Sequence, residues 1–137
     1  MKKFKGLMTS LTPHWSTPKW LYDELNKEFN FDFDPCPLHS DFDGLKIEWG
    51  KSNFINPPYN REITKWLNKG FEELKKGKMS VFLLPARTDT KWWHDYVMEA
   101  LEIRFIKGRL KFGDSKNSAP FPSCIVILKE VNNGKKL

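Results

Sequence analysis

Cysteine is scarce in this sequence, with only Cys36 and Cys124 among 137 residues. Two cysteines are too few for a disulfide framework, and reduced thiols in a cytosolic protein are the default interpretation. Long apolar runs are also absent, since the longest, Val81 to Ala86, is far below the roughly 20 residues that a membrane-spanning helix needs. The basic start, residues 1–10, precedes no apolar segment of signal-peptide length. We therefore expect a cytoplasmic protein with no membrane partner.

Metal-ligand motifs are equally sparse. Cys36 and His39 have a C-x-x-H spacing. The remaining candidates, His14, His94 and Cys124, form no second paired motif, whereas structural zinc sites usually combine two such pairs. The sequence therefore predicts no metal site.

Positive charge and aromatic rings are abundant. The formal net charge is +6, and aromatic residues make up 15% of the chain. This composition suits a partner with a phosphate backbone and bases on which rings can stack, although many soluble domains are mildly basic with aromatic cores. A length of 137 residues and a hydrophobic content of 39% predict one folded domain, residues 1–137, with no separate recognition domain.

Helical and strand patterns alternate along the chain. Apolar spacing predicts helices at 18–29, 61–76 and 90–100, with Thr17 as the first N-cap and with Asn30 and Gly77 as helix ends. Strands are expected at 31–34, 52–55, 81–84, 103–106, 110–112 and 123–129, and a loop at 35–50. This order predicts an α/β fold with a doubly wound, mixed sheet. Ligands of such sheets bind beyond the carboxyl ends of the strands.

The most informative motif is Asn56-Pro57-Pro58-Tyr59, directly after the strand expected at 52–55. The exocyclic amine of adenine is a poor nucleophile because its lone pair is delocalised into the ring. The Asn56 side-chain oxygen and the Pro57 carbonyl oxygen can accept from its two N–H groups and localise that lone pair for attack on a sulfonium methyl group. The two prolines stiffen the loop, and Tyr59 can stack on an extruded base. The alternative is a turn that reads Asn-Pro-Pro-Tyr by chance.

Two further segments could bind a cofactor. Trp15-Ser16-Thr17-Pro18 lies at a helix start, where free N–H groups suit a carboxylate, or it is only a cap with a packed tryptophan. Asp34, followed by Pro35 and Cys36, ends the strand expected at 31–34, where a carboxylate can bind polar cofactor groups or merely form a turn.

Basic residues near the expected crevice are candidates for DNA contacts. Arg87 and Lys91 follow the strand at 81–84, in front of Trp92 and Trp93, either of which could stack on a base or belong to the core. Lys107, Arg109 and Lys111 alternate with apolar residues, so they share one face, which is either solvated or bound to DNA.

Together these segments resemble the phage-type, Dam-like family of DNA N6-adenine methyltransferases. The matching motifs are Trp15-Ser16-Thr17-Pro18, Asp34-Pro35-Cys36, Asn56-Pro57-Pro58-Tyr59 with the helix through Trp66, residues 83–90, Gly108-Arg109-Leu110-Lys111-Phe112 and Pro120-Phe121-Pro122-Ser123. The resemblance implies a reduced Rossmann-like methyltransferase fold that binds S-adenosylmethionine near Trp15, Ser16, Thr17, Pro18, Asp34, Cys36 and Asn56. It also implies adenine-containing double-stranded DNA as substrate, a target adenine held by Asn56 to Tyr59, and a phage or prophage origin in a bacterial cell.

The chain departs from most adenine methyltransferases in two respects. No glycine-rich loop follows Asp34, and the interval to Ser52 is too short for two further strand–helix units. The acid that holds the cofactor ribose is therefore open among Asp41, Asp43 and Glu48. Sequence specificity would come from a loop such as 114–122 or from a partner subunit, and a homodimer remains open.

Two other functions remain compatible with the motifs. A protein glutamine methyltransferase also uses an Asn-Pro-Pro-Tyr loop, but that class needs a glycine-rich cofactor loop and a longer chain. A non-catalytic DNA-binding module that kept the fold is the second alternative. Binding of S-adenosylmethionine discriminates an enzyme from such a module.

Overall fold

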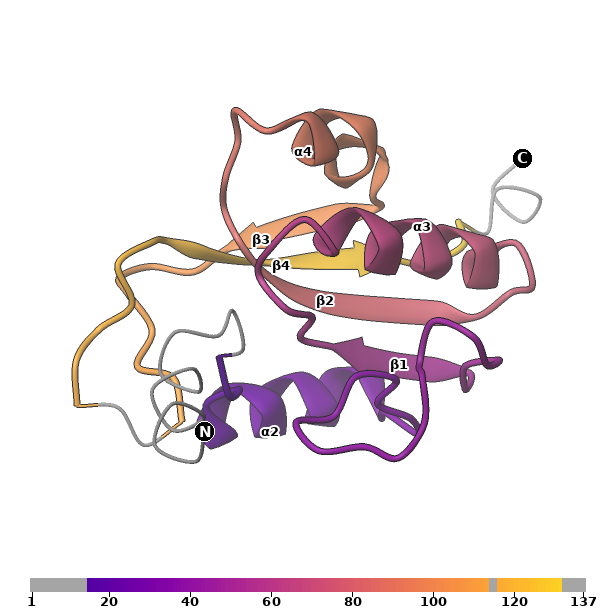
Figure 1. Cartoon of the computed structure of the whole chain (residues 1–137), viewed down its shortest axis with the longest axis horizontal. Helices are drawn as coiled ribbons and strands as arrows, with labels where there is room; N and C mark the ends of the chain where they lie inside the picture. Colours follow the sequence, from indigo (N-terminus) through magenta and orange to yellow (C-terminus); the bar gives the residue numbers. More distant parts are fainter. Residues whose placement is uncertain (1–14, 114–115, 132–137) are drawn as a thin grey trace, which may run out of the picture.

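In the part of the chain that the structure describes, four strands form one mixed sheet in the order β1-β2-β4-β3 (Figure 1). The structure is a computed structural model that describes residues 15–113 and 116–131. The strands are β1 (Ser52–Ile55), β2 (Met79–Pro85), β3 (Glu102–Phe105) and β4 (Ser123–Leu128). β1 and β2 are parallel, and β4 runs antiparallel between β2 and β3. The predicted α/β class and mixed sheet are confirmed.

A helix covers each face of the sheet (Figure 1). On one face, α2 (Lys19–Phe29) buries Leu21 and Leu25, and its Tyr22 ring meets Phe54 of β1 at 5.3 Å between centroids. On the other face lies α3 (Ile63–Leu74), where a Cβ added at Gly70 would come within 2.8 Å of the Phe82 ring. This close approach needs glycine. The sheet is thus the middle layer of three, with β1, β2 and β4 largely buried and the edge strand β3 more exposed.

The helix ends follow the sequence except at one cap. Asn30 adopts the left-handed conformation with φ of 51° and ends α2, and Gly77 follows α3 with φ of 84°. The expected cap at Thr17 is wrong, because Pro18 occupies the N-cap position and no side chain caps the helix. The Thr17 hydroxyl is instead committed to Asn56.

Two predicted strands do not form. Residues 31–34 make only a single parallel bridge, Phe33 to Asn53, because the Asp34 carboxylate turns the chain by accepting from the Cys36 N–H. Residues 110–112 pair with no strand. There, Ala119 N–H donates to the Leu110 carbonyl, while the Leu110 and Phe112 side chains are buried in the core. At 110–112 the apolar alternation therefore correctly indicated which side chains are buried, but it wrongly indicated a strand.

The helix predicted at 90–100 is broken. The structure has α4 (Lys91–Asp95) and a 3-10 turn, η1 (Val97–Glu99). Thr90 caps α4 by accepting from the Trp93 N–H at 3.2 Å. The break falls at Tyr96, whose ring packs against Phe71 of α3 at 6.0 Å. Over the described part of the chain, no helix combines the length and apolarity that crossing a bilayer requires.

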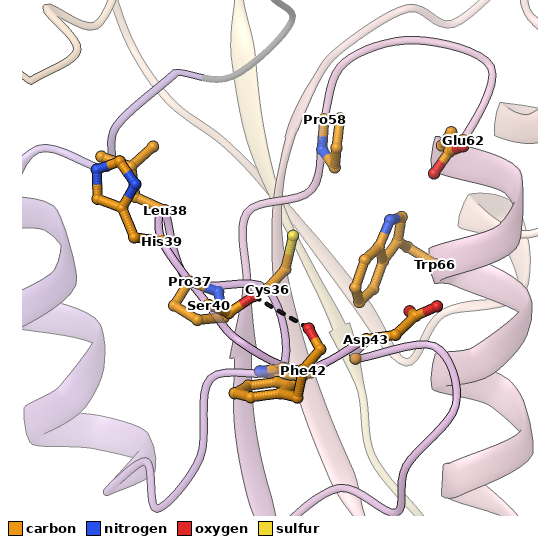
Figure 2. Close-up of a pocket in the computed structure, with 12 residues that line it drawn as sticks. Cys36, Pro37, Leu38, His39, Ser40, Phe42, Asp43, Pro58, Glu62 and Trp66 are labelled. Atoms are coloured by element: carbon orange, nitrogen blue, oxygen red, sulfur yellow. Dashed lines mark hydrogen bonds between the residues drawn. The ribbon is translucent and has the colours of Figure 1, made fainter.

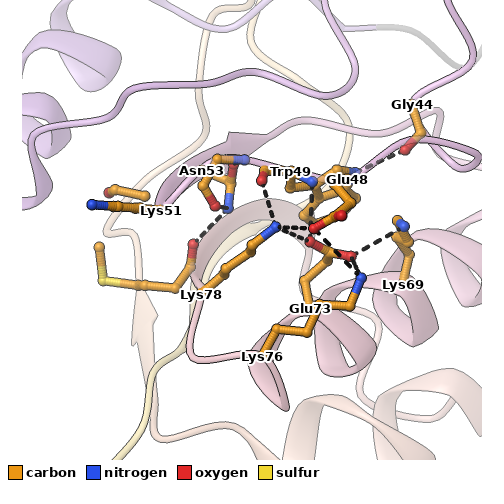
Figure 3. Close-up of polar contacts among 12 residues, drawn as sticks. Gly44, Glu48, Trp49, Lys51, Asn53, Lys69, Glu73, Lys76 and Lys78 are labelled. Atoms are coloured by element: carbon orange, nitrogen blue, oxygen red, sulfur yellow. Dashed lines mark hydrogen bonds and ion pairs between the residues drawn. The ribbon is translucent and has the colours of Figure 1, made fainter.

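The loop at 35–50 is fixed at its end by the buried carboxylate of Glu73 in α3 (Figure 3). Glu73 Oε1 accepts from the Trp49 N–H at 3.0 Å, and the carboxylate forms ion pairs of 3.1 to 3.2 Å with three lysines, Lys69, Lys76 and Lys78. Burial alone would raise the pKa of Glu73, but these donors outweigh it and lower the pKa to about 2. The loop therefore returns to the sheet at a defined position.

Candidate functional site

Asn56 follows the last residue of β1, and its side-chain amide is held by the segment that precedes α2. Its Nδ2 donates to the Trp15 carbonyl oxygen and to Thr17 Oγ1, the latter at 3.0 Å. A carbonyl oxygen can only accept, so the amide nitrogen must face Trp15. The Oδ1 atom on the other side is buried without a hydrogen-bond partner. Such atoms are rare in folded proteins, and catalytic sites are one place where they occur.

A cavity of about 180 Å³, here the Asn56 cavity, lies beside this amide. It is lined by Trp15, Ser16, Thr17, Asp34, Cys36, Leu38 and Asn56. The structure thus brings together all the residues predicted to surround the cofactor except Pro18, which is buried at the start of α2 and does not line the cavity. Their role in cofactor binding stays a prediction.

Asp34 carries the negative charge of the Asn56 cavity. Burial raises the pKa of this carboxyl from 3.8 to about 6, and the hydrogen bond from the Cys36 N–H offsets part of the rise. Among the described residues, no basic side chain lies within ion-pair distance of it. A half-buried carboxylate without a cationic partner favours a cationic ligand.

A second and larger cavity of about 520 Å³, here the Trp66 cavity, is shown in Figure 2. It lies between the loop that follows Asp34 and the start of α3 and is lined by Pro35, Cys36, Pro37, Leu38, His39, Ser40, Phe42, Asp43, Gly44, Pro58, Glu62 and Trp66. Cys36 and Leu38 line both cavities. Burial raises the pKa of the Cys36 thiol to about 12, so it forms a neutral wall between them.

The three acids considered for the cofactor ribose lie in different places relative to the two cavities. Asp43 lines the Trp66 cavity. Glu48 forms ion pairs with Lys78 at 2.9 Å and Lys76 at 3.8 Å on the far side of the loop (Figure 3). Asp41 is exposed and lines neither cavity. Only Asp43 is placed to meet a ligand there.

The rest of the Asn-Pro-Pro-Tyr loop packs into the core. Pro57 is buried, and Pro58 lines the Trp66 cavity. Tyr59 is only 6% exposed; its hydroxyl donates to the Leu83 carbonyl oxygen at 3.1 Å, and its ring lies edge-on to Phe112 and Phe121. In this conformation the ring face is covered by protein. Stacking of Tyr59 on a base stays a prediction and would require the segment around Phe112 and Phe121 to move.

The predicted DNA-contacting residues are all exposed. Arg87 lies after the end of β2, with its guanidinium 5.7 Å from the Phe121 ring centroid. Lys107, Arg109 and Lys111 lie in an irregular segment in which Gly108 is exposed as well, so the expected strand with one basic face is not formed. Lys91 pairs with Asp95 at 2.6 Å, so its charge is already partly offset. DNA binding by these residues is untested. Of the two tryptophans behind them, Trp93 is buried and Trp92 half-buried.

Trp66 and Glu62 are the site residues that sequence reasoning missed. Both line the Trp66 cavity, Glu62 as the N-cap of α3 and Trp66 from within the helix, four residues apart. The sequence signal that could have identified these two residues is their position shortly after the Asn-Pro-Pro-Tyr loop. Within 15–113 and 116–131, no group of three or more His, Cys, Asp or Glu side chains could hold a metal ion, and His14 lies outside those residues.

Polar residues at the carboxyl ends of two parallel strands, with a helix on each face, are compatible with a reduced methyltransferase-like fold. The chain belongs to the DNA N-6-adenine-methyltransferase (Dam) family, whose sequence profile matches residues 6–136. The family resemblance inferred from the motifs is confirmed.

Two curated relatives are DNA N-6-adenine-methyltransferases of bacteriophages. The protein of Haemophilus phage HP1 is 29% identical over 134 residues, which cover 84% of this chain and 78% of the relative. The protein of Escherichia phage T1 is 27% identical over 124 residues, covering 80% of this chain and 52% of the relative. No solved structure matches the chain.

Proposed function

We propose that this protein transfers a methyl group from S-adenosylmethionine to the N6 amine of adenine in DNA. The observation that carries the proposal is the state of Asn56: its nitrogen is held by Trp15 and Thr17, and its oxygen is buried without a partner. The family and the names of the two phage relatives agree with this reaction.

Asn56 acts on the nucleophile. With Nδ2 occupied, Oδ1 is the atom that can accept from the adenine N6–H, and the Pro57 carbonyl oxygen can accept from the second N–H. Two acceptors of this kind localise the lone pair on N6 and stabilise the positive charge that develops there. The rigid prolines keep both acceptors in place, so little reorganisation is needed when the base arrives.

The Asn56 cavity fits the cationic end of the cofactor. When bound, S-adenosylmethionine supplies an electrophilic methyl group on a positively charged sulfur. Asp34 offers the unpaired carboxylate that such a cation requires, next to the Asn56 amide. Together, the two cavities reach the size range of small-molecule sites, about 300–1,000 Å³. Asp34 therefore orients the cofactor while Asn56 orients the base.

DNA approaches from the side of the exposed basic residues. Arg87, Lys107, Arg109 and Lys111 would neutralise phosphates, a contact that positions the duplex without reading its sequence. The target adenine must leave the stack to reach Asn56, at a cost of a few kcal/mol. The same surface distinguishes this proposal from methylation of a protein glutamine, which needs no phosphate contacts.

The direct test is incubation of the protein with labelled S-adenosylmethionine and unmethylated DNA, followed by nucleoside analysis. Labelled N6-methyladenine is expected with the wild type and not with Asn56→Ala. Lys27→Gln, a substitution on the far end of α2, serves as the matched control. DNA binding without cofactor binding would identify a non-catalytic module and overturn the proposal.

A further inference from the structure

Trp66 has an indole N–H that the fold does not use. The residue is 6% exposed, and its Nε1 is buried without an acceptor. Figure 2 shows this nitrogen at the edge of the ring toward Pro58 and Glu62, two other residues that line the Trp66 cavity. An indole nitrogen can only donate. The missing partner is therefore an acceptor atom.

The Trp66 ring is held in place by its neighbours. It stacks on Trp49 with 6.3 Å between centroids and 25° between planes. Trp49 in turn donates through Nε1 to the Gly44 carbonyl oxygen at 2.7 Å and is bound through its backbone to Glu73. A Cβ at Gly44 would meet the Pro35 carbonyl at 1.9 Å, so the loop fits tightly against this pair. The unpartnered N–H thus has a fixed direction.

An acceptor of hydroxyl protons lies in the same cavity. Asp43 fixes its carboxylate by accepting from the Leu45 N–H at 2.9 Å through Oδ1. The other oxygen can accept from a ligand. A cavity that presents one donor on an aromatic wall and one carboxylate matches a purine nucleoside, which carries ring-nitrogen acceptors and ribose hydroxyls. The Asn56 cavity, where the methyl group must lie, is its neighbour, with Cys36 and Leu38 lining both.

We propose that the Trp66 cavity binds the adenosine half of the cofactor, with Trp66 Nε1 donating to a purine ring nitrogen and Asp43 accepting from the ribose. This inference rests on the proposed function. It assigns a site to the adenosine half of the cofactor in a chain whose interval between Asp34 and Ser52 is too short for two further strand–helix units. The loop at 35–44 replaces them. Because Nε1 is covered in the free protein, the cavity wall adjusts around the nucleoside as it binds.

The test uses S-adenosylhomocysteine, the demethylated cofactor, as the probe and calorimetry as the measurement. Trp66→Phe keeps an aromatic ring and removes the donor. Asp43→Asn keeps one oxygen for Leu45 and replaces the second acceptor with a donor. Each substitution is expected to weaken binding about fivefold, the equivalent of one lost hydrogen bond. Asp41→Asn, in the same loop but outside both cavities, is the matched control and should bind as the wild type does.

Single-atom changes in the probe separate hydrogen bonding from packing. The 1-deaza, 3-deaza and 7-deaza forms of S-adenosylhomocysteine each replace one ring nitrogen with C–H. One of them should bind the wild type about fivefold more weakly than the parent probe does. Trp66→Phe should bind that deaza form and the parent probe equally, because the mutant has no indole donor to lose. If Trp66→Phe does not fold, the wild-type indole N–H resonance of Trp66 must shift with the parent probe and not with that deaza form.

The outcomes are distinct for the two proposals. A wild type that binds neither S-adenosylmethionine nor the probe overturns the proposed function. Two results with a wild type that binds the probe overturn only the adenosine assignment. In the first, Trp66→Phe binds the probe as tightly as the wild type does. In the second, Trp66→Phe loses as much affinity for each deaza form as the wild type loses. If Trp66→Phe weakens binding of DNA with an extruded adenine and leaves the probe unaffected, the cavity takes the base and the assignment is wrong.

Discussion

The Asn56 side chain donates to the backbone carbonyl of Trp15, 41 residues earlier in the chain. This bond joins the end of β1 to the segment that leads into α2, and it leaves Asn56 Oδ1 as the free end of the amide. The orientation of the proposed acceptor therefore depends on a backbone atom that no side-chain substitution at Trp15 removes.

Asn56→Asp is expected to abolish most methyl transfer. The aspartate has nearly the same shape, but its carboxylate cannot donate to the Trp15 carbonyl, so the acceptor loses its fixed direction. Loss of one preorganised contact of this kind typically costs about 10²–10³ in kcat. Single-turnover assays with labelled S-adenosylmethionine measure the rate, and calorimetry should show a much smaller change in cofactor affinity. Equal rates for mutant and wild type would refute the role of Asn56.

Asp34→Asn should stabilise the free protein at neutral pH and weaken cofactor binding. The pKa of Asp34 is raised to about 6, so folding favours the protonated carboxyl. That favourable contribution is present below pH 3.8 and is lost as the pH rises through about 6. At pH 7 the ionised carboxyl therefore costs on the order of 1–2 kcal/mol, which Asn removes. Thermal unfolding of both proteins between pH 4 and 8 tests the sign.

The affinity for the cofactor should rise with pH, whereas the contribution of Asp34 to folding stability falls. A bound cation lowers the pKa of Asp34, so binding releases a proton near pH 6 and the affinity falls as the pH drops below that value. Calorimetry in buffers of different ionisation enthalpy measures the released proton. No release with the wild type, or the same release with Asp34→Asn, would contradict a carboxylate–cation contact.

Glu73→Ala is expected to destabilise the protein by about 3 kcal/mol, because the Trp49 N–H and three lysines lose a buried carboxylate. The pKa of Glu73 is depressed from 4.5 to about 2, so its contribution is present above pH 4.5 and is lost as the pH falls toward 2. Urea unfolding of the wild type and Glu73→Ala should therefore converge at low pH. Glu72→Ala, exposed on the same helix, is the control and should change little.

Arg109→Gln should weaken DNA binding uniformly across sequences and reduce the slope of log affinity against log salt by about 1. The side chain is exposed in the basic alternating segment, and loss of one phosphate contact predicts this change. Lys27→Gln is the matched control. It lies near Phe29, whose carbonyl accepts from Ser52 at the start of β1, the opposite end of the sheet from the crevice. An equal effect of both substitutions would remove the interface assignment.

Tyr59→Phe should lower the free energy of unfolding by about 1 kcal/mol, because the buried Leu83 carbonyl loses its contact with the hydroxyl while the ring remains. Chemical denaturation measures this loss. Fluorescence of 2-aminopurine at the target position tests the earlier expectation of base stacking. A reduced signal is expected with Tyr59→Ala but not with Tyr59→Phe if the ring stacks on the base.

The fold followed from the sequence where the signal was local. The apolar run around Val81 predicted a strand, and Asn30 and Gly77 predicted helix ends through their tolerance of positive φ. The prediction failed where tertiary contacts decide the outcome. Leu110 and Phe112 alternate like a strand, yet they are buried outside the sheet, and the break at Tyr96 coincides with the packing of its ring on Phe71.

The site shows the same division. Asn56, Asp34 and Trp15 could be grouped from the sequence because each follows or precedes an element whose end lies at one edge of the sheet. Trp66 could not, since a tryptophan on the apolar face of a helix resembles any core residue. Only the structure shows that its N–H lacks a partner. The choice of Asp43 over Glu48 also required three dimensions, because Lys76 and Lys78, in the turn between α3 and β2, form ion pairs with Glu48.

The loop at 35–50 is anchored at both ends, by the bridge of Phe33 to β1 and by the contact of Trp49 with Glu73. Its middle pairs with no strand. Because the loop at 35–50 forms one wall of the proposed binding site, insertion or exchange of residues between the two anchors can change that site while the sheet stays intact. New ligand preferences in such a minimal scaffold could therefore evolve by changing one surface segment and without rebuilding the hydrophobic core.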